Sequence, residues 1–219
     1  MVAPTSGPSD TRIRLAQARD TDVADTLPAI AGARLILVLR SAIENGTAAS
    51  VLPAGWAAPS RPFFDTAARA FVTQPMAESM SGIGLPLVTV DQEDRVVGVL
   101  SVTAPGAIID RALDHGYEPP KALTLGVAVA KIHGLAVSET ARSQGLATTL
   151  LKRAWQVHEQ LGYFLLYGSY ETERDLGAFY TRCGYTVLAP AQGFAPIDIL
   201  FGIHAGPDEC VLTRRRSRR

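Results

Sequence analysis

The stretch from Arg142 to Thr148, RSQGLAT, combines residue types that suit the binding of an anion. An apolar strand pattern precedes it and an amphipathic helix pattern follows it. The first turn of such a helix has unpaired backbone N–H groups, which attract negative charge together with the helix dipole. Gly145 has no side chain to hold a bulky diphosphate away from the backbone, Ala147 is nearly as small, and Arg142 adds positive charge. A strand-to-helix junction can equally be a plain connection, so its meaning depends on the rest of the chain.

Hydrophobic spacing predicts the elements that position this stretch. One helix face is marked by residues that recur every three or four positions before Gly162, namely Leu146, Leu150, Ala154, Val157 and Leu161. The preceding segment 122–138 is rich in Val, Leu and Ala, so much of it is expected to be a long buried strand. The full predicted order is a strand at 12–18, a helical stretch at 20–45, a short helix at 63–74, a hairpin of strands at 85–91 and 95–105, a helix at 106–116, the long strand, the helix at 146–161, a strand at 163–170, a short helix at 172–185 and last strands at 186–190 and 210–215. This order predicts an α/β protein whose mixed sheet has helices on its faces.

The length of 219 residues and the hydrophobic content of 47% suit one globular domain. Residues 1–10 are rich in Pro, Ser and Gly and are expected to be disordered. Residues 11–213 are expected to form the domain, and the arginine-rich residues 214–219 to form a solvated tail.

Charge and cysteine content exclude several classes of protein. Lysine plus arginine and aspartate plus glutamate both number 21, and this neutral balance argues against a general nucleic-acid binder. Cys183 and Cys210 lack the spacing of a metal site or a disulfide framework, which indicates reduced thiols in a cytoplasmic protein. The N-terminus has no signal-peptide pattern, and the apolar run at 35–39 is far too short to span a bilayer, so we expect no membrane association.

Three motifs resemble, in combination, the GNAT superfamily of acyl-CoA-dependent N-acetyltransferases. They are LAV at Leu135–Val137, RSQGLA at Arg142–Ala147 and FYTRCGY at Phe179–Tyr185, and IRLAQARDTD near the N-terminus resembles the opening strand of that family. The resemblance implies the GNAT fold, an α/β (α+β) architecture with a mixed, mostly antiparallel sheet, a splayed parallel pair of strands and helices on both faces. It also implies that acetyl-CoA is the co-substrate and that no metal takes part.

The resemblance assigns the co-substrate to the strand and the junction. In the family, the pantetheine arm of coenzyme A bonds to the backbone of the strand that carries the LAV motif, and the diphosphate lies on the N–H groups of the following turn. The implied contacts of this chain are therefore Leu135, Ala136 and Val137 for the arm, and Arg142, Ser143, Gln144, Gly145, Leu146, Ala147 and Thr148 for the diphosphate.

The resemblance also implies two catalytic side chains. Tyr180 occupies the position of the tyrosine that faces the thioester sulfur in many family members and that protonates the leaving thiolate. His133 lies two residues before Leu135 and matches the position of a histidine in the arylalkylamine N-acetyltransferase branch, where it helps to deprotonate the amine. An ordinary histidine titrates near pH 6.5, so we expect the acid limb of the rate profile near neutrality. Packing of Tyr180 and a hydrogen-bonded His133 inside the sheet are the alternative interpretations.

Two positions depart from the common pattern of the family. Glu173 stands where most members have an asparagine that contacts the pantetheine arm, and Leu176 stands where most have alanine. Cys183 lies beside the tyrosine motif, but a thiol in a short helix is more often an inert small hydrophobe, so no covalent acyl-enzyme is expected.

The sequence therefore predicts an N-acetyltransferase that moves the acetyl group of acetyl-CoA directly to an amine. A small amine, an antibiotic amine and a peptide or protein amine all stay open as acceptors, and so do a larger acyl group and a homodimer. Four aromatic residues are candidates for the acceptor site, namely Trp56, Phe63, Phe64 and Phe194. The alternatives are a non-catalytic acyl-CoA-binding module of the same fold and an RNA-associated acetyltransferase that uses the arginine tail.

Overall fold

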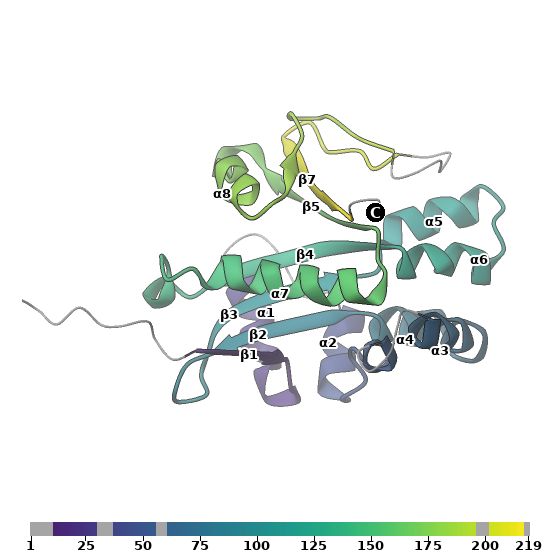
Figure 1. The fold of residues 1–219 in the computed structure, drawn as a ribbon, viewed down its shortest axis with the longest axis horizontal. Helices are drawn as coiled ribbons and strands as arrows, with labels where there is room; N and C mark the ends of the chain where they lie inside the picture. Colours follow the sequence, from purple (N-terminus) through teal and green to yellow (C-terminus); the bar gives the residue numbers. More distant parts are fainter. Residues whose placement is uncertain (1–10, 30–36, 56–60, 196–201, 217–219) are drawn as a thin grey trace, which may run out of the picture.

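The fold is seen in a computed structural model that describes residues 11–29, 37–55, 61–195 and 202–216. The expected disordered segment 1–10 lies outside these residues. In chain order the helices and strands are β1 (Arg12–Leu15), α1 (Thr21–Ala29), α2 (Leu37–Glu44), α3 (Arg61–Thr73), α4 (Met76–Gly82), β2 (Leu85–Val90), β3 (Val96–Thr103), α5 (Gly106–Asp114), α6 (Pro119–Leu123), β4 (Val129–Val137), α7 (Leu146–Leu161), β5 (Leu165–Glu171), α8 (Gly177–Arg182), β6 (Thr186–Val187) and β7 (Glu209–Arg215) (Figure 1).

The strands form one sheet in the order β1-β2-β3-β4-β5-β7-β6. Each neighbouring pair is antiparallel except β4 and β5, which are parallel. The predicted hairpin is β2 and β3, and the predicted mixed, mostly antiparallel sheet with one parallel pair is confirmed.

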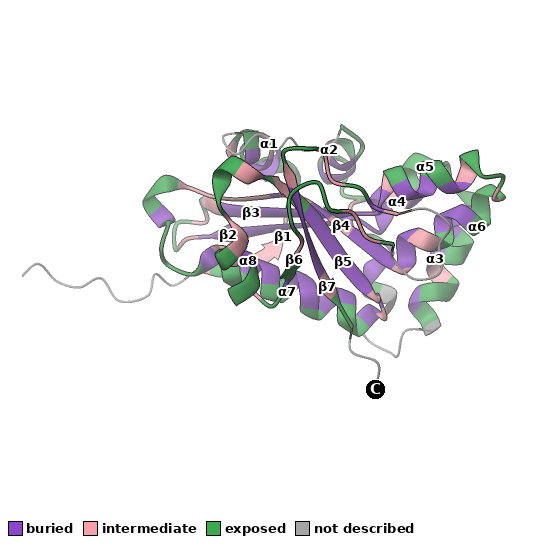
Figure 2. Ribbon diagram, turned by 90° about the horizontal axis from the view of Figure 1, so that it is seen from above, coloured by how far each residue is buried: buried purple, intermediate pink, exposed green. Residues whose placement is uncertain are grey.

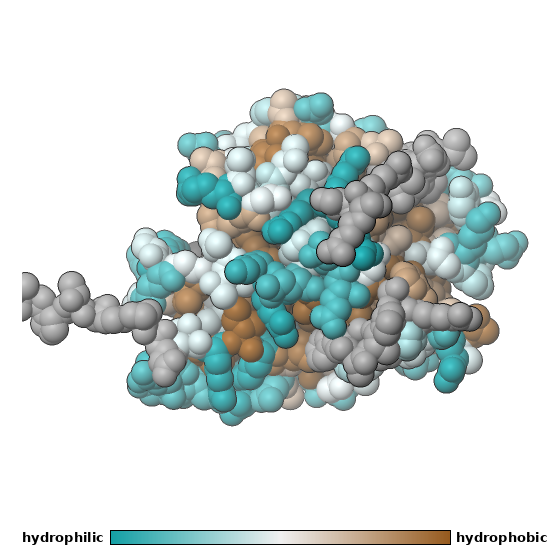
Figure 3. Space-filling view, viewed as in Figure 1, coloured by the Kyte–Doolittle hydropathy of each residue, from teal (hydrophilic) through white to brown (hydrophobic). Residues whose placement is uncertain are grey.

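Helices cover both faces of the sheet, as predicted. On one face, α1 and α2 pack against Val88, Val90 and Val99. On the other face lies α7, whose predicted apolar residues are all buried and whose outward side is hydrophilic (Figures 1–3). Gly162 ends α7 in the left-handed conformation that favours glycine, with φ of 94°. None of the helices in the described part of the chain is long and apolar enough to cross a bilayer.

Of the helical stretch expected at 20–45, the structure describes the helices α1 and α2, and residues 30–36 lie outside the described residues. The structure differs from the predicted elements in several places. The helix α4 was not predicted. The strand expected within 122–138 begins only at Val129, because Pro119 and Pro120 start the helix α6 and a single 3₁₀ turn follows it. The helix α8 begins at Gly177 instead of residue 172, since Asp175 takes a left-handed conformation with φ of 43° that interrupts helical geometry.

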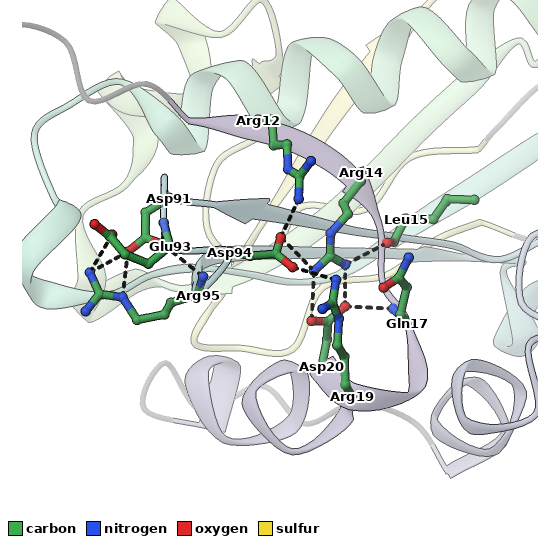
Figure 4. A network of polar contacts seen from close by, with 10 residues as sticks. All are labelled: Arg12, Arg14, Leu15, Gln17, Arg19, Asp20, Asp91, Glu93, Asp94 and Arg95. Atoms are coloured by element: carbon green, nitrogen blue, oxygen red, sulfur yellow. Dashed lines mark hydrogen bonds and ion pairs between the residues drawn. The ribbon is translucent and has the colours of Figure 1, made fainter.

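A polar network ties the N-terminal strand to the start of α1 (Figure 4). Arg14 makes an ion pair with the buried Asp20, and the backbone N–H of Gln17 donates to the same carboxylate at 2.7 Å. Burial alone would raise the pKa of Asp20, but the hydrogen bonds from Arg14 and Gln17 lower it below its ordinary value. Arg12 and Arg19 meet Asp94 of the β2–β3 turn. The network therefore fixes α1 against the sheet.

The last strand, β7, covers the strand predicted at 210–215, whose final two residues also fall in the range expected for the tail. Arg214 and Arg215 belong to β7, and both guanidinium groups lie over aromatic rings. Arg214 is 4.6 Å from the ring centre of Trp155 and 5.9 Å from that of Tyr185, while Arg215 is 5.6 Å from that of Phe194. These two arginines are held by cation–π contacts within the protein.

Candidate active site

The parallel strands β4 and β5 separate after a short register. They pair over three positions, the last of which joins Lys131 to Tyr167. Beyond these residues β4 continues to Val137 and β5 to Glu171, without another β4–β5 pair in the described register. The divergence leaves the second half of β4 beside open space, where the backbone of a strand can bond to a ligand.

A β-bulge lies at the point of divergence. On β3, Ser101 pairs with Gly134 and Val102 pairs with Ile132, so His133 is the extra residue on β4. A bulge bends the strand and changes the direction of nearby side chains. This bulge in the β3–β4 register explains how the side chains of His133 and Leu135 can line the same cavity, although the strand is irregular between them.

A cavity of about 630 Å³, which we call the cleft, lies between the second half of β4, the start of α7 and α8. It gathers six of the residues expected to bind the co-substrate together with the expected acid, and five that the sequence analysis did not select. The expected residues are Leu135, Ala136, Val137, Arg142, Ser143, Ala147 and Tyr180, and the others are Leu27, Glu139, Arg174, Leu176 and Phe179.

The junction between β4 and α7 has the backbone of a ligand-binding turn. Ser143 and Gly145 take left-handed conformations, with φ of 64° and 77°. The hydrogen bond from Thr149 N–H to the Gly145 carbonyl belongs to the first turn of α7, so the N–H groups of residues 146–148 precede the helical ladder. A β-carbon built on Gly145 would meet open space. Four of the expected residues do not line the cleft, although they lie next to or between residues that do, namely Gln144, Gly145, Leu146 and Thr148.

Tyr180 of α8 is buried, with 6% of its surface exposed, and lies among aromatic rings. Its ring centre is 5.5 Å from that of Tyr170, 5.0 Å from that of Phe179 and 6.0 Å from that of Tyr185. Burial, with smaller contributions from Cys183 and Tyr170, raises the pKa of Tyr180 to about 12. The hydroxyl therefore keeps its proton at neutral pH, as a proton donor must, and is a weaker acid than an ordinary tyrosine.

His133 and Tyr180 line one further cavity, of about 220 Å³, which adjoins the cleft through shared walls at Leu135, Arg174 and Leu176. Burial, and secondarily the positive charge of Lys131, lowers the pKa of His133 to about 4. The imidazole is therefore neutral at neutral pH, as a proton acceptor must be, and is a weaker base than an ordinary histidine. This pKa lies below the value near neutrality that we expected from the sequence, because burial disfavours the charged imidazole.

The two residues that depart from the family pattern, Glu173 and Leu176, lie in different surroundings. Leu176 lines both the cleft and the smaller cavity, whereas Glu173 is exposed and lines neither. Arg174 lines both cavities and makes an ion pair with Glu171 at 3.0 Å. Arg174 carried no recognisable signal in the sequence, because its place depends on the turn at Asp175.

The described aromatic residues considered for the acceptor site lie outside the cleft and the smaller cavity. Phe63 is fully buried in the core, 5.8 Å from the ring of Tyr163, and Phe64 is half-exposed beside it. Phe194 packs near Arg215, and Trp56 lies outside the described residues. No described member of the set lines the cleft or the smaller cavity. The described residues contain no group of three or more His, Cys, Asp or Glu side chains that could hold a metal ion.

The model of the acetyltransferase (GNAT) family matches residues 55–185, which is more than half of the chain. The chain belongs to this family and is an acyltransferase, and the co-substrate of the family is acetyl-CoA. The match covers the strand β4, the junction and α8, which together form the cleft. The arylalkylamine branch stays a prediction.

Solved structures share the fold at low sequence identity. The ribosomal-protein-S18-alanine N-acetyltransferase from Escherichia coli is 13% identical over 95% of this chain and 96% of that chain, with a TM-score of 0.51. A GNAT-family acetyltransferase from Streptococcus pneumoniae is 12% identical over 95% of this chain and 100% of that chain, with a TM-score of 0.50. At these identities the likeness shows the fold alone. A search of the curated proteins finds no match to the chain.

Proposed function

We propose that the protein is an N-acetyltransferase that moves the acetyl group of acetyl-CoA directly to a primary amine. The observation that carries this proposal is the placement of His133 and Tyr180 on the walls of one cavity beside the splayed strands. One side chain can accept a proton at neutral pH and the other can donate one. Acyl transfer from a thioester to an amine needs both functions.

The cleft suits the co-substrate in shape and in polarity. The second half of β4 pairs with β3 but not with β5, so on its β5 side it offers the backbone of residues 135–137 to the pantetheine arm. The start of α7 offers N–H groups to the diphosphate. Arg142 and Arg174 add positive charge to its walls. The open space at Gly145 leaves room for phosphate oxygens close to the backbone. Bound there, acetyl-CoA supplies an acetyl group activated as a thioester.

The residues of this chain then handle two protons. His133, directly or through a water molecule, takes the proton that the amine loses when its nitrogen bonds to the acetyl carbon. Tyr180 gives its proton to the sulfur as the carbon–sulfur bond breaks, which releases the free thiol and the amide. Solvent returns a proton to Tyr180 and removes one from His133, so the enzyme ends as it began.

Release of free thiol from acetyl-CoA tests the proposal. The intact chain is supplied with acetyl-CoA and a panel of primary amines that includes amino acids, simple alkylamines, peptides and aminoglycosides. We expect thiol release with at least one class and an acetylated product of the matching mass. Binding of acetyl-CoA without thiol release for every amine would contradict the proposal and favour the non-catalytic module.

A further inference from the structure

A third cavity, which we call the apolar pocket, adjoins the candidate active site on the other side of His133. It has a volume of about 590 Å³ and lies between α2, α4, the start of α5 and the strands β3 and β4. Its apolar wall includes Val38 and Leu39 of α2 and Met76 and Met80 of α4. A cavity of this size and composition is typical of a site for a small ligand with an apolar body.

Lys131 is the sole charged side chain among the described residues that line the apolar pocket. It lies on β4 two positions before His133, and its charge helps to lower the pKa of that histidine. None of the ion pairs within the described part of the chain includes Lys131. Lys131 is half-buried and also lines a neighbouring cavity that includes Glu209. Because its ammonium group makes none of these ion pairs, a ligand in the apolar pocket that brings an anion would give it a partner of opposite charge.

We propose that the acceptor is an apolar α-amino acid, bound with its carboxylate at Lys131, its amine at His133 and its side chain in the apolar pocket. This inference rests on the proposed acetyl transfer to a primary amine. An α-amino acid carries its amine and its carboxylate on one carbon atom, and Lys131 and His133 are separated by a single residue on one strand.

The charge of Lys131 also discriminates between acceptors. It repels polycations, so aminoglycosides fit this pocket poorly. A simple alkylamine would fill the apolar wall but would leave Lys131 without a partner.

Matched acceptors separate the contribution of the carboxylate from that of the side chain. Leucine and 3-methylbutylamine differ by the carboxylate, as do phenylalanine and phenethylamine, while leucine and serine differ in the side chain. We expect kcat/KM for the amino acid to exceed that for its decarboxylated partner by roughly 10- to 100-fold, the usual range for a bond to a charged group. Leucine should exceed serine by about 10-fold or more.

Variants of Lys131 test the assignment of the carboxylate. Lys131→Met keeps most of the length of the side chain and removes its charge. Any effect through His133 is common to both acceptors, so kcat/KM for leucine should fall by roughly 10- to 100-fold more than that for 3-methylbutylamine. Lys131→Arg should retain the preference for leucine. Lys121→Met removes an exposed lysine of α6 and should behave as the wild type. Acetyl-CoA affinity, measured by calorimetry, reports whether each variant is folded.

Three outcomes would overturn the inference. In the first, the wild type uses 3-methylbutylamine as well as leucine, and in the second, Lys131→Met weakens both acceptors equally. In the third, only peptides or aminoglycosides are acetylated, which contradicts the amino-acid acceptor but leaves the proposed N-acetyltransferase intact. Absence of thiol release with every amine contradicts both proposals.

Discussion

The two parts of the Tyr180 side chain have different roles. Its ring packs against other aromatic rings, and its hydroxyl is the group that can react. The ring is enclosed by three aromatic neighbours, and the residue lines both cavities of the candidate site. With a pKa of about 12 the hydroxyl stays protonated throughout the pH range of ordinary assays. A residue with this environment can donate a proton without changing its packing.

The first prediction removes that hydroxyl. Tyr180→Phe keeps the ring, so stability and acetyl-CoA affinity should persist, while kcat should fall by about 100-fold or more because the leaving sulfur loses its acid. Steady-state rates under conditions where chemistry limits turnover provide the measurement. Tyr185→Phe is the control, since it removes a buried hydroxyl of a neighbouring ring that lines neither cavity. Near-normal kcat for Tyr180→Phe would show that another group is the acid.

The second prediction concerns the titration of His133. Its pKa of about 4 means that the neutral, proton-accepting form persists from neutral pH down to about pH 4, where any acid limb due to His133 should appear. Lys131→Met removes one of the two causes of the low pKa and should raise it, although burial keeps it below 6.5. Proton NMR of the imidazole over a pH series measures both values. A wild-type His133 that titrates near pH 6.5 would contradict the buried environment.

Sequence reasoning selected cleft residues that belong to local motifs and did not select those that reach the cleft through tertiary packing. Leu135–Val137 and Tyr180 lie in short motifs, and the cleft indeed gathers them. The low pKa of His133 depends on burial by distant segments and on the charge of Lys131, neither of which the motif encodes. Leu27 comes from α1, far away in the sequence, so its presence in the cleft follows only from the packing of α1 on the sheet.

Among the elements, α7 contributes both to the candidate ligand site and to the hydrophobic core. Its first turn borders the cleft, and its buried face packs on β2, β3 and β4. Near its C-terminus the fully buried His158 donates from Nδ1 to the Ala154 carbonyl at 2.8 Å, and its ring meets that of Tyr163 edge to face. Its Nε2 has no hydrogen-bond partner among the described residues. This arrangement accommodates the neutral imidazole and disfavours the charged one.

The third prediction follows from that environment. Burial lowers the pKa of His158 to about 4, although the bond to Ala154 acts in the opposite direction. Between pH 6.5 and 4 the unfolded chain binds a proton at His158 that the folded chain does not, so the free energy of unfolding falls as the pH falls. Between pH 7 and pH 4.5, the free energy of unfolding should fall by about 2 kcal/mol less in His158→Phe than in the wild type, because the variant has no imidazole to protonate. Urea denaturation at the two pH values measures this difference. An unchanged pH dependence in the variant would contradict the low pKa of His158.

Element boundaries were predictable where one period dominates the sequence. The spacing of α7 over sixteen residues gave its bounds and its buried face from the apolar positions alone. The segment 122–128 was expected to be strand because its composition is apolar, but tertiary contacts and the preceding prolines favour helical turns there. The helix α4, MAESMSG, was not predicted, since seven residues with two serines and a terminal glycine give too little periodicity.

At the scale of the whole molecule, the sheet consists of two parts joined by the short parallel register. Strands β1–β4 form one part and β5, β7 and β6 form the other, and the two parallel strands pair over only three positions. The cleft has walls from both parts, with β4 and the start of α7 on one side and α8 on the other. A ligand bound in the cleft should therefore connect the two parts and stabilise the folded protein against heat.

The most direct test of this account compares two glycines with the same backbone geometry. Gly145 and Gly116 have φ of 77° and 80°, and a β-carbon at either would meet open space, but only Gly145 lies at the start of α7. Glutamate at either position imposes a similar backbone cost, whereas Gly145→Glu also adds bulk and negative charge where we place the diphosphate. Isothermal calorimetry should show acetyl-CoA affinity reduced by at least about tenfold in Gly145→Glu and close to the wild type in Gly116→Glu. Equal, wild-type affinity in both folded variants would contradict the placement of the co-substrate in the cleft.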